Sequence, residues 1–278
     1  MPRSREVDGA HDLRDGGNDG PPFLPRARRT RSVGDHLPFK KLKDLGNPRG
    51  KARRMSPPKT SKPLRTRRGS SPEERAAWRA TYEETSYDQL PWFEPGPSPP
   101  VRLAVEEGFL PSGGEVLDVG CGAGSNVLFL SASGYRAHGI DLSPGAVAAA
   151  RARVSEAHLG AEIEEGDALA LSFPDGGLDG MVDNGCFHTL PIARREDYAK
   201  EAYRVLRPGG SLVLSWVARE HTAMMGPRHR PSLLEVTTAL ESRFLFVRTG
   251  FQPSREEGAP STYFAFLTRR STPYPPPR

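Results

Sequence analysis

The sequence predicts an α/β fold in which helices cover both faces of a seven-stranded, mostly parallel sheet whose last strand is antiparallel. The first observation is that strand-like and helix-like segments alternate from about residue 115 to residue 242. The second is that the last two strand-like segments are joined by a loop too short for a crossover helix, so they should pair antiparallel. The third is a change of composition near residue 72, which separates a basic segment from this pattern.

Local signals justify the elements in order. A helix should begin after Ser71, a typical N-cap residue that is followed by proline and two glutamates. Residues 95–100 should form a proline-rich loop and residues 101–109 a short amphipathic helix. Ser143 repeats the cap pattern, and Pro208 with the two glycines after it should end a later helix and form a turn. The expected strands are 115–120, 136–141, 161–167, 178–184, 211–218, 244–251 and 262–269, and the helices between them 124–133, 144–159, 194–206 and 231–242.

Charge and composition divide the chain into segments. Residues 1–72 carry 19 Lys and Arg against 7 Asp and Glu, a net charge of +12, whereas the rest carries 20 against 27. We expect a disordered, basic Pro/Arg-rich tail over 1–72, a folded domain over 73–270 that opens with a helical segment at 73–112, and a disordered end at 271–278. The tail is interpreted as a solvated segment, with Met55 as a possible internal start, or as a nucleic-acid-binding arm.

Several classes of protein are not favoured by this composition. No apolar run approaches the length of about 18 residues that crosses a bilayer, and the N-terminus has no hydrophobic signal region. The two cysteines, Cys121 and Cys186, cannot form a disulfide framework. No HExxH or paired CxxC pattern predicts a metal site. We therefore expect a cytoplasmic protein that neither spans a membrane nor holds a metal.

A glycine-rich turn stands at the end of the first strand, in the stretch VLDVGCGAGSN from Val116 to Asn126. Glycines at 120, 122 and 124 let a ligand approach the backbone, and the helix that follows suits an anion. The dinucleotide fingerprint G-x-G-x-x-G would need its third glycine at position 125, which is serine. The spacing therefore disfavours a nicotinamide-dependent reductase.

This G-x-G-x-G turn, preceded by Asp118, resembles the first motif of class I S-adenosylmethionine methyltransferases. Two acids follow at suitable distances: Asp141 could bind ribose hydroxyls, as it would in a dinucleotide enzyme, and Asp167 matches the acid that accepts the adenine amino group in that family. The stretch VLRPGGSLVLSWV resembles a later landmark, so the resemblance covers about residues 75–270 and implies a Rossmann-like fold. The expected cofactor-binding residues are Asp118, Gly120, Cys121, Gly122, Gly124, Asn126, Asp141, Leu142, Asp167, Ala168, Asp183, Asn184 and Trp92.

The segment MVDNGCFHTLP, residues 181–191, follows the fourth strand and should face the reacting centre. It lacks the Asn/Asp-Pro-Pro-aromatic signature of enzymes that methylate nucleobases and glutamine amides. With LPWFEPGPSPP upstream, it is similar to the thiopurine-methyltransferase and tellurite-resistance-like branch, in which an N-terminal segment with a tryptophan folds over the cofactor. That similarity implies that residues 73–112 form a lid with Trp92. The candidate catalytic residues are His188, as a general base or a pocket-wall residue, and Asp183. Asp183 and Asn184 would also hold the cofactor ammonium or the substrate.

The resulting hypothesis is an S-adenosylmethionine-dependent enzyme that methylates an S, O or N nucleophile of a small molecule by in-line displacement. Two alternatives remain: an RNA or protein methyltransferase that uses the basic tail as a tether, and a protein that binds S-adenosylmethionine without transferring the methyl group. The expected partner is a small-molecule acceptor. Nucleic acid is a possible but less favoured partner through the tail, and the chain is expected to be a monomer or a weak dimer.

Overall fold

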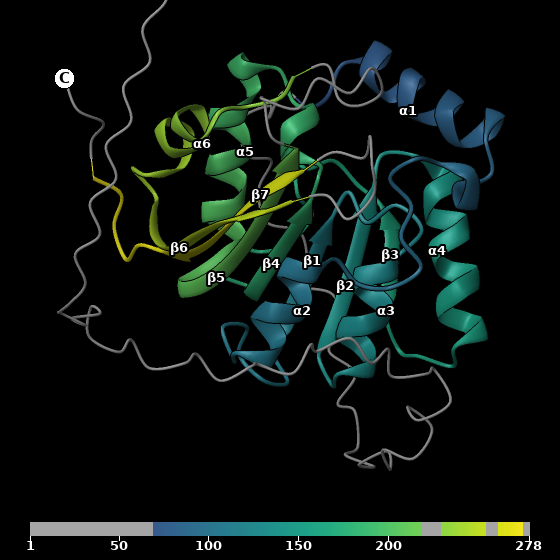
Figure 1. The fold of residues 1–278 in the computed structure, drawn as a ribbon, viewed down its shortest axis with the longest axis horizontal. Coiled ribbons are helices and arrows are strands. Elements are labelled where there is room, and N and C mark those ends of the chain that lie inside the picture. The colour runs from purple at the N-terminus through teal and green to yellow at the C-terminus, as the bar shows by residue number, and fades with distance from the viewer. Residues whose placement is uncertain (1–68, 218–228, 254–260, 275–278) are drawn as a thin grey trace, which may run out of the picture. The chain divides into compact units, whose positions relative to one another are not determined.

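The computed structural model describes residues 69–217, 229–253 and 261–274 (Figure 1). The chain divides into two units, Met1–Lys51 and Ala52–Arg278, and every described residue belongs to the second. Residues 1–68 of the tail predicted over 1–72 lie outside the described residues. Residues 275–278 of the predicted C-terminal end also lie outside them.

A seven-stranded sheet with the order β3-β2-β1-β4-β5-β7-β6 forms the centre of the described unit. The pairs β1–β2, β1–β4, β2–β3 and β4–β5 are parallel, whereas β7 is antiparallel to both β5 and β6. The predicted fold class is thus confirmed, including its antiparallel last strand. The strands are β1 Glu115–Val119, β2 Arg136–Asp141, β3 Glu162–Glu165, β4 Leu178–Asn184, β5 Leu206–Val217, β6 Phe244–Gln252 and β7 Thr262–Arg269.

Helices cover both faces of the sheet because successive strand residues point to opposite sides. Buried Val213 packs in the core that contains α2, α3 and α4, whereas its neighbours Leu212 and Leu214 pack in the core that contains α5 and α6. Both cores are built from aliphatic and aromatic side chains that water does not reach. The helices are α1 Pro72–Glu84, α2 Pro99–Glu106, α3 Ser125–Ala132, α4 Pro144–Glu156, α5 Ile192–Val205 and α6 Leu233–Leu240, with short 3-10 turns η2 Tyr87–Gln89 and η3 Phe187–Thr189.

Two predicted helix starts, after Ser71 and after Ser143, are confirmed by their caps. The Ser71 hydroxyl accepts a hydrogen bond from the backbone N–H of Glu74, whose side chain accepts one from the backbone N–H of Ser71, so α1 begins in a capping box. Ser143 caps α4 in the same way with its hydroxyl alone. These caps satisfy backbone N–H groups that have no partner inside the helix.

Several predicted boundaries differ from the structure, and two of the differences have a clear physical cause. The helix expected over 101–109 runs from Pro99 to Glu106, because prolines fit the first turn of a helix, where no N–H bond is needed. The turn expected at Pro208 is part of β5, which begins at Leu206. Gly209 has a positive φ of 76°, and the pairing with β4 shifts there, so the glycine forms an irregularity inside the strand rather than a separate turn.

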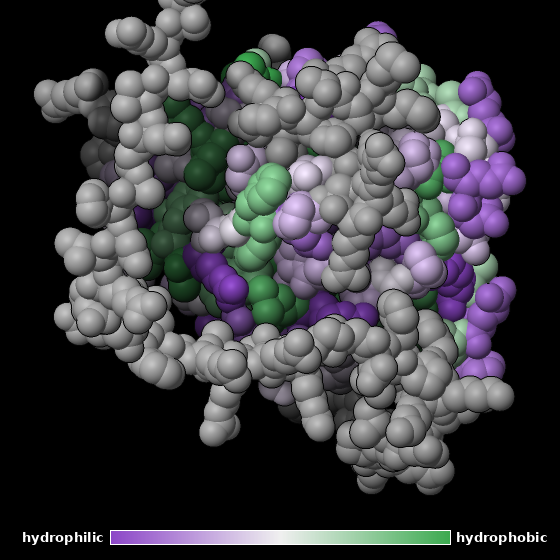
Figure 2. Space-filling view, in the orientation of Figure 1, coloured by the Kyte–Doolittle hydropathy of each residue, from purple (hydrophilic) through white to green (hydrophobic). Residues whose placement is uncertain are grey.

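The solvent-facing side of α4 is hydrophilic. Figure 2 shows hydrophilic side chains gathered over α4, where Arg151 and Glu156 are exposed. Among the described residues, no helix combines the length and the apolarity that a bilayer crossing requires. The same part of the chain holds no group of three or more acidic, histidine or cysteine side chains arranged for a metal ion.

Candidate functional site

Four buried aspartates meet at the carboxyl edge of the sheet. They follow or end four neighbouring strands: Asp118, Asp141, Asp167 and Asp183. Since β1 lies between β2 and β4, the direction of winding reverses beside β1, and ligands of open α/β sheets bind at such a point. Burial raises the pKa of the Cys186 thiol, and all four of these carboxylates raise it further. Each of the four therefore lies within electrostatic reach of Cys186.

Asp118 carries the clearest sign of a missing partner. Its side chain is buried, and its Oδ2 atom has no hydrogen-bond partner among the described residues. Burial and the neighbouring Asp183 raise its pKa to about 8, while a hydrogen bond from Asn126 acts in the opposite direction. A buried acceptor without a donor is costly, so a cationic N–H group at this position would be strongly favoured.

The glycine turn lies directly after Asp118. Gly122 has a positive φ of 53°, and a Cβ placed on it would lie 3.1 Å from the hydroxyl oxygen of Tyr82. Gly120 and Gly124 also have positive φ, at 68° and 79°. Cys121, between two of them, is buried and donates its backbone N–H to the carbonyl of Ile140 at 2.9 Å. The turn is therefore hydrogen-bonded to β2, and its glycines leave space for Cys186 at Gly120 and for Tyr82 at Gly122.

Helix α3 begins at the end of this turn. Its N-cap is Gly124, which provides no side-chain cap. The backbone N–H groups in the first turn of a helix have no partner inside the helix, and such groups can bind an anion. Asn126 is buried in this turn, and its Oδ1 accepts the backbone N–H of Ser98 at 2.9 Å. Asn126 thereby links the start of α2 to Asp118.

Asp141 stands at the end of β2, where the sequence predicts it. Its Oδ2 accepts the N–H of Gly122 at 3.0 Å, and its Oδ1 accepts that of Ser143 at 2.9 Å. Burial raises its pKa, and backbone hydrogen bonds from Ser143, Gly122 and Leu142 oppose that effect. The carboxylate offers about four lone-pair positions, so these three donors leave one for a ligand hydroxyl. The ribose-binding role of Asp141 and Leu142 stays a prediction.

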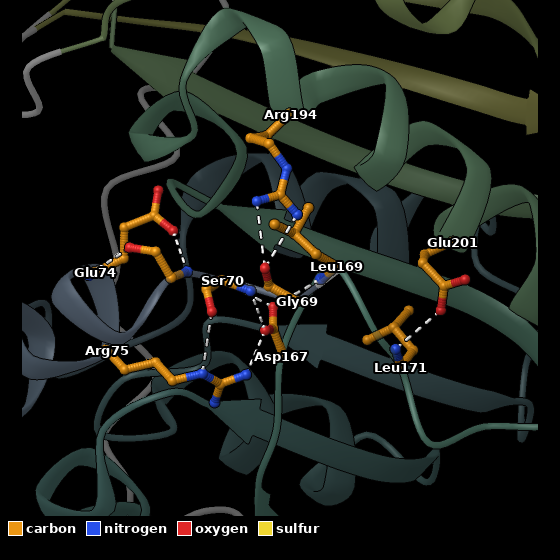
Figure 3. Close-up of polar contacts among 10 residues, drawn as sticks. Gly69, Ser70, Glu74, Arg75, Asp167, Leu169, Leu171, Arg194 and Glu201 are labelled. Carbon is orange, nitrogen blue, oxygen red and sulfur yellow. Dashed lines mark hydrogen bonds and ion pairs between the residues drawn. The ribbon is translucent and has the colours of Figure 1, made fainter. Parts of the chain in front are cut away.

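Asp167 follows β3 and is already engaged by the N-terminal segment (Figure 3). Its carboxylate accepts the guanidinium of Arg75 at 2.5 Å and two donors of Ser70. Ala168 beside it is buried. The predicted contact of Asp167 and Ala168 with an adenine ring is untested, and Arg75 was not expected here.

Asp183 is satisfied within its own turn. Its Oδ1 accepts the N–H of Cys186 at 2.8 Å, its Oδ2 accepts the hydroxyl of Tyr198 at 2.7 Å, and the N–H of Phe187 contacts both oxygens. Burial raises its pKa to about 6 against the effect of these hydrogen bonds. The Oδ1 of neighbouring Asn184 accepts the hydroxyl of Ser215 at 2.6 Å. Asp183 thus anchors η3, and the predicted ammonium, substrate or catalytic contacts of this pair stay predictions.

His188 lies buried in η3 at the same edge. Its Nδ1 accepts the backbone N–H of Val217 at 3.1 Å, so the proton of the neutral ring belongs on Nε2. Burial, followed by the charges of Arg230 and Arg195, lowers its pKa to about 3. In this arrangement the imidazole can donate a hydrogen bond from Nε2. It could serve as the predicted base only after giving up the contact with Val217.

The N-terminal segment reaches the glycine turn through a residue that the sequence analysis missed. Tyr82 of α1 faces Gly122, and its Cβ would lie 2.9 Å from a Cβ placed on Gly145. Trp92 is half exposed, packs edge-on against Trp78 at 6.0 Å between ring centroids, and hydrogen-bonds to Tyr82. Trp92 therefore supports Tyr82, and Tyr82 lies nearer the turn.

Arg153 of α4 is a second unexpected residue. Its Nη1 donates to the carbonyl of Ala123 at 2.5 Å and to the Ser125 hydroxyl at 3.0 Å, and its Nη2 donates to the carbonyl of Pro95 at 3.2 Å. Its guanidinium also lies over the rings of Tyr87 and Phe93, 5.2–5.8 Å from their centroids. It clamps the segment before α2 to the glycine turn. These partners are far apart in the sequence, so no local pattern could have indicated them.

Comparison with known proteins agrees with this arrangement. Residues 116–210 match a family described as a methyltransferase domain. The chain is 29% identical over 148 residues to 2-heptyl-1-hydroxyquinolin-4(1H)-one methyltransferase of Mycobacteroides abscessus, covering 53% of this chain and 60% of that one. It is 38% identical over 113 residues to 2-methyl-6-phytyl-1,4-hydroquinone methyltransferase of Synechocystis, covering 40% and 35%. The matches thus span 60% and 35% of the length of these two relatives.

Among solved structures, the fold is similar to that of 1,6-didemethyltoxoflavin-N1-methyltransferase of Burkholderia thailandensis, which was solved with 1,6-didemethyltoxoflavin and S-adenosylhomocysteine bound. The TM-score is 0.57 at 20% identity, and the match covers 76% of this chain and 94% of the other. At this identity the likeness concerns the fold alone. The sheet order, the glycine turn and the family match over residues 116–210 agree with one another, and this part of the chain is similar to methyltransferase domains.

Proposed function

We infer that this protein transfers a methyl group from S-adenosylmethionine to a small-molecule acceptor. The observation that carries this inference is the buried Oδ2 of Asp118, which has no donor in the described part of the chain and lies at the point where ligands of such sheets bind. An amino acid ammonium is a donor of the required charge. The glycine turn and the first N–H groups of α3 suit the carboxylate of the same amino acid.

Two acids farther along the sheet edge are the acceptors proposed for the remaining parts of this cofactor. Asp141 retains an acceptor position for a ribose hydroxyl, and Asp167 with Ala168 is the pair proposed for the adenine edge. Tyr82, supported by Trp92, would cover the glycine turn and exclude water. When bound, S-adenosylmethionine supplies a methyl group already activated on a sulfonium. The protein then has to orient the acceptor and keep water away.

The acceptor is proposed to be an oxygen nucleophile that is ionised before it reacts. His188 supports this because its Nδ1 is occupied by Val217, which leaves Nε2 as a hydrogen-bond donor. Arg195 and Arg230 both lower the pKa of His188, so positive charge acts at this position. A donor beside positive charge favours a bound oxyanion. Two of the relatives are named for a hydroxyquinolinone and a hydroquinone, which are ring compounds with such oxygens.

The experiment is a transfer assay with the full chain, S-adenosylmethionine labelled in its methyl group, and a panel of acceptors. The panel contains a hydroxyquinolinone, hydroquinones and, because similarity to the thiopurine and tellurite-resistance-like branch stays a prediction, aromatic thiols. Labelled product from an oxygen acceptor would support the proposal, with less product from Asp118→Asn than from Asp179→Asn. Asp179 is the matched control because it pairs with Arg207 at the opposite end of β4. Absence of both transfer and cofactor binding would contradict the proposal.

Three further expectations stay predictions. They are a cytoplasmic location, a monomer or weak dimer, and nucleic acid as a possible but less favoured partner through the basic tail. Size-exclusion chromatography at several protein concentrations would measure the second. Loss of RNA or DNA binding with rising salt would measure the third.

A further inference from the structure

Asp167 has its hydrogen-bonding capacity filled by the protein itself. Its Oδ2 accepts the backbone N–H of Ser70 at 2.6 Å and the Nη2 of Arg75 at 2.5 Å. Its Oδ1 accepts the Ser70 hydroxyl at 3.0 Å and the N–H of Leu169 at 2.9 Å. An ionised carboxylate offers about four lone-pair positions, and these donors use all of them (Figure 3).

Three of these four donors come from the segment Ser70–Arg75, which lies more than 90 residues away in sequence. The segment is itself fastened in place. Gly69 offers its carbonyl to both terminal nitrogens of Arg194, at 3.3 and 3.2 Å, and Arg75 Nε donates to the carbonyl of Ser70 at 3.4 Å. Figure 3 shows Arg75 and Arg194 on opposite sides of the Gly69–Ser70 backbone.

The fit at Gly69 is close. A Cβ placed there would lie 2.6 Å from Asp167 Oδ2, which is closer than side chains tolerate. Glycine at position 69 therefore allows the backbone to approach the carboxylate of Asp167 this closely. The pairing is also unequal in exposure: the side chain of Asp167 is 5% exposed and that of Arg75 is 41% exposed. Water can reach Arg75 far more easily than its partner, so Arg75 is the side from which the contact can open.

We propose that the segment Ser70–Arg75 competes with the adenine end of the cofactor for Asp167, so that cofactor binding releases this segment. The proposal rests on the proposed function, in which Asp167 accepts the adenine amino group. Because no acceptor position of Asp167 is left over, that amino group and at least one donor of the segment exclude each other. The apparent affinity for the cofactor is then reduced by the fraction of molecules in which the segment is docked.

The test is a calorimetric titration of S-adenosylhomocysteine into the full chain and two variants. Arg75→Ala should bind the ligand about two- to tenfold more tightly than the unmodified protein, the range expected for removing one competing hydrogen bond or ion pair. Arg79→Ala should bind like the unmodified protein, because Arg79 is an exposed arginine of the same helix. Gly69→Ala supplies an independent route to the same result, since its Cβ would push the backbone off Asp167.

A second ligand tests whether the gain depends on the adenine amino group. S-inosylhomocysteine carries a carbonyl at that position. The substitution Arg75→Ala should therefore increase the affinity for S-inosylhomocysteine less than it increases the affinity for S-adenosylhomocysteine. Unchanged or weaker binding of S-adenosylhomocysteine by Arg75→Ala and Gly69→Ala, with normal binding by the unmodified protein, would overturn the competition and leave the proposed function standing. If the unmodified protein and Arg79→Ala also fail to bind, the proposed function fails and this inference fails with it.

Discussion

The hydroxyl of Tyr198 donates a hydrogen bond to the Oδ2 of Asp183 at 2.7 Å, and both side chains are buried where α5 meets η3. This contact turns an acid at the sheet edge into a structural anchor. Tyr198→Phe removes the donor and leaves a buried carboxylate oxygen with less hydrogen bonding. We expect a loss of about 1–2 kcal/mol in the free energy of unfolding, measured by urea denaturation.

Tyr203→Phe is the matched control for this change. The Tyr203 hydroxyl donates to the carbonyl of Ser271 at 3.1 Å in an exposed position, where water can replace it. We expect a change below about 0.5 kcal/mol. Equal losses of unfolding free energy in the two variants would show that the buried hydrogen bond to Asp183 stabilises the fold no more than an exposed one.

Asp118→Asn should separate cofactor binding from stability. The amide keeps the shape of the side chain and removes its charge, so the affinity for S-adenosylhomocysteine should fall about 10- to 100-fold, as expected for a lost charge-assisted hydrogen bond. The pKa of Asp118 in the folded protein is about 8, against an ordinary value of 3.8. Between these values the folded state holds a proton that the unfolded chain has lost, so stability falls as the pH rises through this range.

Asn at position 118 abolishes that pH-dependent loss, so the ligand-free variant should be more stable than the unmodified protein at pH 8, measured by thermal unfolding. Calorimetry in buffers of different ionisation enthalpy should also detect a proton released when the unmodified protein binds the ligand near neutral pH. A variant that binds as well as the unmodified protein would mean that Asp118 does not meet the ammonium.

Gly122→Ala should reduce both stability and ligand binding. The residue has a positive φ of 53°, which costs an alanine about 1–2 kcal/mol, and its Cβ would approach the Tyr82 hydroxyl. Gly134→Ala carries a comparable backbone penalty, because Gly134 has a φ of 89°, but its Cβ would enter open space. Thermal unfolding should show similar losses for both variants, whereas calorimetry should show weaker ligand binding for Gly122→Ala alone. Weakened binding in both would point to general destabilisation instead.

His188→Gln should reduce the loss of stability in acid. The pKa of His188 is about 3 in the folded protein against an ordinary 6.5, so between these values the unfolded chain binds a proton that the folded protein does not. Stability therefore falls as the pH drops from about 6.5 towards 3, by up to about 1.4 kcal/mol per pH unit. Glutamine retains an acceptor for the N–H of Val217 and does not titrate. Parallel curves of unfolding free energy against pH for the two proteins would contradict this assignment.

The sequence by itself determined the alternation of strands and helices, because each element carries its signals locally. Ser71 and Ser143 stand before prolines where α1 and α4 begin, and the apolar runs of β2, β4 and β7 end at the predicted residues. Once these runs are strands of one parallel sheet, their carboxyl ends share an edge. Asp118 and Asp141 could therefore be placed together without a structure.

Only the tertiary structure decided which acids already have partners. Asp183 is satisfied by Tyr198 from α5 and Asp167 by Arg75 from α1, whereas the Oδ2 of Asp118 has no donor among the described residues. The same holds for His188, whose free nitrogen depends on Val217. These contacts join residues from 15 to 92 positions apart. Local sequence patterns specify backbone conformation within a few neighbours, but a hydrogen bond between distant side chains exists only once packing has fixed both of its ends.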